Sequence, residues 1–276
     1  MTLAPTPTPR PELQRRTQTL QGLLGQMAAL NVAGLILTIL AAAGLFSFIS
    51  SADLGGPVVW LWLLPTAVMT GVYLSFLRAA QRAVGSAGEY ARTRVAPPTL
   101  LDDTNRMAAW LRALQILAVL GALLSMAVNL AVPGLSEELR PADGPRTVIA
   151  AAIPSLISLV LAWLTCEAFR RFFVAVRDHA AGKGAAVLPA ARSASGWMMF
   201  LYILQWIGIA FLLMGAVAVL VITLAGGGAL LPSIGPLEWL VGLATAAFLV
   251  WAISLGVRFY GYASRFATEV GEALTP

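Results

Sequence analysis

Residues 197–224 read WMMFLYILQWIGIAFLLMGAVAVLVITL, and none of these 28 successive side chains carries a charge. A helix that crosses a bilayer needs about 20 predominantly apolar residues. Five other stretches of similar character occur, at 28–50, 57–77, 108–131, 148–169 and 237–257. No strand-like alternation between turn residues competes with them. The sequence therefore predicts an all-α integral membrane protein, a bundle of six transmembrane helices.

The composition of the chain supports this prediction. Of the 276 residues, 59% are apolar and 11% are charged, and the mean hydropathy is +0.81. Soluble domains are about 45–50% apolar and about 25% charged, so a water-soluble enzyme is excluded. The net charge of +5 would suggest nucleic-acid binding in a soluble protein. Here the basic residues border apolar stretches, so we expect no nucleic-acid partner.

The basic residues also predict the orientation of the helices. If the six stretches cross the membrane, 16 of the 18 Lys and Arg residues lie on one side, and only Arg140 and Arg146 lie on the other. Because cytoplasmic loops are enriched in Lys and Arg, both termini are predicted to be cytoplasmic. The amphipathic ends of the helices and the use of arginine in 17 of the 18 basic positions lead us to expect the inner membrane of a bacterium. Each cation at this face would attract anionic lipid heads by about 1 kcal/mol.

The chain divides into a polar start and one membrane domain. Residues 1–26 are rich in proline, threonine and arginine and are expected to be disordered, whereas residues 27–276 form the membrane domain. Apolar positions 169, 172, 173 and 176 share one helical face, so the fourth predicted helix should continue beyond the lipid as an amphipathic segment. The second and sixth predicted helices are expected to continue in the same way.

Two sequence markers indicate an internal repeat. An apolar residue followed by a side-chain amide recurs at Leu30-Asn31, Leu114-Gln115 and Leu204-Gln205. An apolar residue followed by arginine recurs near the ends of the second, fourth and sixth predicted helices. These markers predict three tandem two-helix hairpins, at 27–100, 101–192 and 193–276, and hence a pseudo-threefold axis along the membrane normal.

The three amides of this repeat form the first candidate site. Asn31, Gln115 and Gln205 would lie at one depth in a symmetric bundle, and amides in lipid seek hydrogen-bond partners inside the protein. They could line a path for a solute or join neighbouring helices. The second interpretation is favoured, since interhelical contacts are the ordinary role of such residues.

Glu167 is the acidic residue that falls within an apolar stretch, and it forms the second candidate site. A carboxylate in a membrane helix is by default a candidate for ion or proton binding. Arg170 and Arg171 follow at i+3 and i+4, however, on the same helical face. We therefore expect an ion pair of Glu167 with Arg170 and Arg171 near the cytoplasmic end of the helix.

Scarce residue types limit the chemistry. The chain has one histidine, His179, and one cysteine, Cys166, so we predict no catalytic residues, metal site or cofactor. Three classes of function stay open. The favoured class is a non-catalytic membrane component that assembles with a partner membrane protein or with itself. The alternatives are a permease or channel for a small, weakly polar solute, and a lipid-modifying enzyme acting near Glu167, Asp178 and His179.

Overall fold

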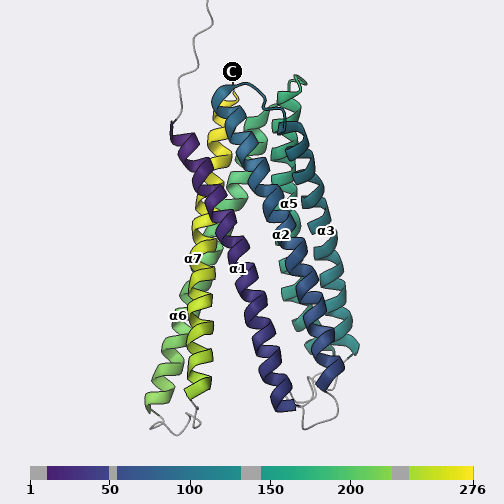
Figure 1. Cartoon of the computed structure of the whole chain (residues 1–276), viewed down its shortest axis with the longest axis vertical. Coiled ribbons are helices and arrows are strands. Elements are labelled where there is room, and N and C mark those ends of the chain that lie inside the picture. The colour runs from purple at the N-terminus through teal and green to yellow at the C-terminus, as the bar shows by residue number, and fades with distance from the viewer. Residues whose placement is uncertain (1–10, 50–54, 132–143, 226–235, 276) are drawn as a thin grey trace, which may run out of the picture. The chain divides into compact units, whose positions relative to one another are not determined.

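The computed structural model describes residues 11–49, 55–131, 144–225 and 236–275, and all regular structure in these ranges is helical (Figure 1). Side chains are described for residues 11–39, 64, 66–123, 153, 156–215 and 245–275. The helices, each of 32 to 39 residues, are α1 (Pro11–Ile49), α2 (Gly55–Thr93), α3 (Leu100–Ala131), α5 (Gly144–Ala180), α6 (Val187–Ala225) and α7 (Pro236–Ala273).

The length of these helices exceeds what a bilayer requires. At 1.5 Å per residue, 39 residues extend about 58 Å, whereas the hydrocarbon core is about 30 Å thick. The segments that follow the second, fourth and sixth predicted spans are helical, and these helices reach Thr93 in α2, Ala180 in α5 and Ala273 in α7.

Within the described residues, four segments are long and apolar enough to cross a membrane. They are Pro11–Ile39, Leu100–Leu123, Val187–Gly215 and Thr245–Ala273. The all-α class is confirmed, and these four segments are consistent with a membrane protein. The remaining expected spans, 57–77 and 148–169, fall in part on residues whose side chains lie outside the described set.

The beginning of the chain differs from the prediction. The sequence predicts disorder for residues 1–26, but α1 begins at Pro11, so residues 11–26 are helical; residues 1–10 lie outside the described ranges. Proline fits the first helical position, and Glu12 in the first turn is favoured by the helix dipole. Leu13, Leu20 and Leu24 are buried on one face. Burial of this leucine face outweighs the polar composition of the segment.

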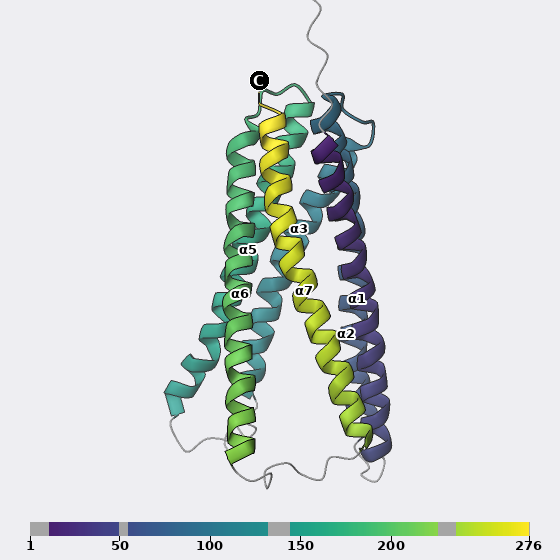
Figure 2. The same ribbon diagram turned by 90° about the vertical axis from the view of Figure 1, so that its left-hand side faces the viewer.

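The described chain comprises two compact units, of which the first contains Ser86–Trp197 and Ala267–Pro276. In this unit α3 and α5 lie side by side (Figure 2). Phe172, Phe173 and Val176 of α5 are fully buried, and Leu100 and Met107 of α3 are buried as well. Two adjacent aromatic rings in α5, Phe172 and Phe173, meet edge to face with centroids 5.2 Å apart. The apolar positions predicted at 172, 173 and 176 thus form a core outside the predicted span.

In the same unit, Arg94 joins the ends of two helices. It follows α2 with a φ of 55°, a backbone conformation common just after a helix end. Its guanidinium donates hydrogen bonds to the backbone oxygens of Ala273, at 2.7 Å, and Thr275, at 2.8 Å. A cation that binds the last carbonyls of a helix also complements the helix dipole, so Arg94 stabilises the end of α7.

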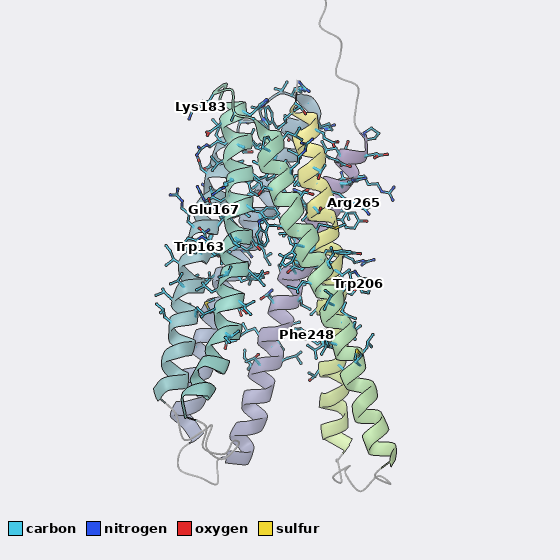
Figure 3. The ribbon with its side chains drawn as sticks, turned by 180° about the vertical axis from the view of Figure 1, so that it is seen from behind. Trp163, Glu167, Lys183, Trp206, Phe248 and Arg265 are labelled. Atoms are coloured by element: carbon cyan, nitrogen blue, oxygen red, sulfur yellow. The ribbon has the colours of Figure 1, made fainter. Side chains whose placement is uncertain are left out.

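The second unit contains Arg10–Gly85 and Met198–Phe266. Leucines from α1 and small residues from α2, including Ala79, Ala80 and Ala83, are buried in it. Small side chains allow two helix backbones to approach closely. The α1 backbone at Gly34 also approaches the ring of Phe248 in α7, since a Cβ added at Gly34 would lie 3.3 Å from its Cζ (Figure 3).

Candidate functional site

In the first unit, Gln115 of the first candidate site lies near Glu167 of the second. The Gln115 amide, which is 5% exposed, donates to the backbone oxygen of Trp163 across the α3–α5 contact, with an N–O distance of 3.3 Å. Trp163 and Glu167 lie one turn apart on α5 (Figure 3). The Gln115 side chain also lies near the Glu167 carboxylate. Gln115 and Glu167 therefore belong to one polar cluster.

Two arginines complete this cluster. Arg170 donates to both carboxylate oxygens of Glu167, at 2.8 Å and 2.7 Å, and Arg171 donates to one of them at 2.8 Å. A bidentate arginine–carboxylate pair is among the stronger hydrogen-bonded contacts in proteins. All the partners of Glu167 in this cluster are donors, so the carboxylate is held in its charged form. It serves as the centre of an ion-pair cluster and is poorly suited to transfer a proton.

The second unit contains a related arrangement at Gln205. Its amide in α6 donates to the backbone oxygen of Ile253 in α7 at 3.2 Å. The amide occupies the space that a side chain at position 256 would need, because a Cβ added at Gly256 would lie 2.6 Å from its Nε2. The Oε1 atom of Gln205 is buried and has no hydrogen-bond partner among the described residues. Position 257, the counterpart of Glu167 by an offset of 90 residues, is valine.

Asn31, the third predicted amide, is used differently. Its side chain donates to the backbone oxygen of Met27, one turn earlier in the same helix, at 3.0 Å. A side chain that returns to its own helix does not join that helix to a neighbour. Each of the three predicted amides therefore donates to a backbone oxygen of the protein, Gln115 and Gln205 on a neighbouring helix and Asn31 on its own.

Sequence reasoning missed a pair of glutamines that join α1 to α2. Gln21 Nε2 donates to the backbone oxygen of Gln81, and Gln81 Nε2 donates to the backbone oxygen of Gln21, both at 3.0 Å. Each amide lies over a glycine of the facing helix, Gln21 over Gly85 and Gln81 over Gly25. We call these four residues the glutamine–glycine clasp. Its signal in the sequence is the motif Gln-x-x-x-Gly, which occurs at 21–25 and again at 81–85.

The residues proposed for lipid chemistry are also held by neighbours. Asp178 accepts from Arg177 at 2.9 Å and lies 3.7 Å from Lys183 Nζ. The hydrogen bond from Arg177 lowers the pKa of the Asp178 carboxyl below its usual value. His179 Nδ1 lies 2.8 Å from the hydroxyl of Tyr90, whose pKa is raised by burial. Glu167, Asp178 and His179 thus interact with different partners, and their contacts do not form an acid–base pair.

A metal site is not indicated in the part of the chain that the structure describes, where no three His, Cys, Asp or Glu side chains are grouped as a metal ion would require.

Comparison of the chain with protein families, with curated proteins and with solved structures finds no match. The inference of function therefore rests on the contacts and exposed surfaces of the described residues.

Proposed function

We propose that the protein is a multi-pass component of the inner membrane of a bacterium that acts without catalysis, by assembling with a partner membrane protein or with further copies of itself. Its six spans would form three tandem two-helix hairpins, with both termini in the cytoplasm. The hydrogen bonds of the buried amides support a non-catalytic role. The side chains of Gln115, Gln205 and the clasp glutamines donate to backbone oxygens of a neighbouring helix and so hold helices together.

One observation carries the proposal of assembly. Phe211, Leu212, Leu213 and Met214 follow one another in α6, and their exposed fractions lie between 62% and 68%. Successive residues of a helix are about 100° apart, so these four cover its whole circumference. Large apolar side chains that are exposed on every side need either lipid or another protein around them. This part of α6 therefore offers an apolar surface for assembly in the membrane.

The proposed repeat is supported by two hydrogen bonds. The bonds from Gln115 to Trp163 and from Gln205 to Ile253 each connect residues 48 apart. Donor and acceptor both shift by 90 residues between the second and third hairpins. The leucines at 111 and 114 likewise shift to 201 and 204. The same contact at the same sequence separation is what a duplicated hairpin would retain. The first hairpin, joined by the clasp, has diverged further under this proposal.

Purification in native membrane discs, followed by native mass spectrometry, tests the proposal of assembly. We expect one fixed stoichiometry, either several copies of this chain or this chain with one partner. Phe211→Ser combined with Met214→Ser should weaken the complex. The matched pair Met199→Ser and Ile203→Ser, earlier on α6, should weaken it less because it keeps the exposed apolar side chains at 211–214. A chain that is always monomeric and homogeneous would contradict assembly.

A permease for a small, weakly polar solute is the second candidate, because the buried Oε1 of Gln205 offers an acceptor that no described residue uses. Proteoliposomes exposed to an osmotic gradient of glycerol or urea distinguish the two proposals. Under the assembly proposal, light scattering should report the same permeation rate as empty liposomes. Faster permeation that is abolished by Gln205→Leu would instead support the permease and remove the first proposal.

A further inference from the structure

A groove lies between α3 and α5 in the first unit. Its volume is about 620 Å³, and it is lined by α3 residues between Asn105 and Ile116 and by Arg170, Val174 and Arg177 of α5. Alanines at 108, 109 and 113 form part of its wall and leave the space between the longer side chains open. Pockets of about 300–1,000 Å³ hold small organic ligands, so the groove has room for a polar headgroup.

The polar part of this groove is positively charged. Arg112, Arg170 and Arg177 line it, and no acidic residue does. Two of these guanidiniums are held in place by other side chains. Arg170 is held by Glu167, and Arg177 is held by Asp178 and by the Oδ1 atom of Asn105, at 2.9 Å. A held guanidinium loses less freedom on binding, and its permanent charge still attracts a phosphate although part of its N–H groups donate to other side chains.

Arg112 differs from these two arginines because it is exposed and has no hydrogen bond or ion pair with any described residue. Its charge is therefore not compensated within the described part of the chain. A free guanidinium beside two held ones provides an additional charge for an anion that enters the groove.

The other end of the groove is apolar. Ile116 lines it and is 60% exposed, and Leu120 and Leu123 continue the same face of α3 with similar exposure. Residues three and four apart share one side of a helix, so these three side chains form an apolar strip that leads away from the arginines. A cationic groove continued by an apolar strip is complementary to an amphiphile with an anionic head.

We propose that this groove binds an anionic phospholipid, with its phosphate between Arg112, Arg170 and Arg177 and an acyl chain along Ile116, Leu120 and Leu123. A soluble phosphate would use the arginines alone and would leave the apolar strip without a role. The inference rests on the proposed function in one respect, because it requires this end of α3 and α5 to lie at the headgroups of a membrane.

Lipid retention tests the proposal. The full-length protein is purified from micelles that contain equal amounts of phosphatidylglycerol and phosphatidylcholine, and native mass spectrometry counts the bound lipid. We expect the wild-type protein to retain phosphatidylglycerol selectively. Arg112→Gln should reduce that retention about fivefold, the factor that corresponds to one cation at an anionic surface. Arg106→Gln, which removes the same charge from an arginine paired with Asp102 outside the groove, should leave it unchanged.

A second variant tests whether the shape of the groove, and not its charge alone, is needed to retain the lipid. Ala109→Phe fills the groove and keeps all three arginines, and it should also reduce retention. Equal losses for Arg106→Gln and Arg112→Gln, or retention without preference for phosphatidylglycerol, would overturn the site in favour of diffuse charge. Displacement of the lipid by millimolar glycerol phosphate would overturn the choice of a lipid and identify a site for soluble anions.

The orientation is tested separately, so that its failure and the failure of the site can be distinguished. In a Cys166→Ala background, Lys183→Cys at the exposed turn after α5 should react with an impermeant maleimide in inverted membrane vesicles and stay unlabelled in intact cells. Labelling in intact cells would contradict the cytoplasmic placement in the proposed function. Lipid retention measured in micelles would still support or overturn the groove by itself.

Discussion

Phe172→Ala should destabilise the protein by about 3–5 kcal/mol, the range for removal of a buried aromatic side chain. Phe172 is fully buried, and its ring meets that of Phe173 edge to face. The substitution removes both the burial and the ring contact, and it leaves a cavity in the core of the first unit. We expect a clearly lower midpoint in thermal unfolding of the detergent-solubilised protein.

Phe211→Ala is the matched control for this prediction. Phe211 is 68% exposed on α6, so the same truncation removes few contacts within the chain and should shift the midpoint little. Equal shifts for the two variants would show that the α5 core contributes no more to stability than the surface of α6. A lower midpoint for Phe211→Ala alone, seen only in the native membrane discs, would instead locate a stabilising partner at α6.

The sequence was sufficient for features that depend on local periodicity. The apolar stretches predicted helices in the correct places, and the amphipathic pattern after residue 169 predicted that α5 continues as a helix past that residue. The contact of Glu167 with Arg170 and Arg171 also follows from i+3 and i+4 spacing. In each of these cases the partners belong to one helix, whose geometry is known before the tertiary structure.

Features that depend on how one helix is rotated against its neighbour could not be predicted from the sequence. The sequence marks Gln115 as an amide in an apolar helix, but its partner, the backbone oxygen of Trp163, follows only from the register in which α3 and α5 meet. The helix from Pro11 was missed for a different reason. The leucines at 13, 20 and 24 repeat on one face, but proline and arginine around them dominate the composition of the segment.

The glutamine–glycine clasp leads to the second prediction. Gly85→Ala should destabilise the protein by about 1 kcal/mol, because the overpacking cost of about 1–3 kcal/mol is partly offset by the higher helix propensity of alanine. A methyl group at this position would collide with the Gln21 amide, which would have to leave the backbone oxygen of Gln81. Each lost interhelical hydrogen bond adds about 0.6 kcal/mol in a membrane protein. The expected measurement is a lower midpoint of thermal unfolding in detergent, with unchanged helix content before the transition.

The direction of the change in stability distinguishes a specific effect at the clasp from a general intolerance of substitution at glycine. Gly22→Ala lies on α1 within the clasp segment, but a Cβ there meets no atom within 4 Å. It should therefore stabilise the protein by up to about 1 kcal/mol, because alanine favours helix over glycine. Combining Gly85→Ala with Gln21→Ala should cost less than the sum of the two single changes, since the methyl group then enters space that the amide has left. Strictly additive effects would mean that Gly85 acts through some other neighbour and that the two glutamines do not hold α1 to α2.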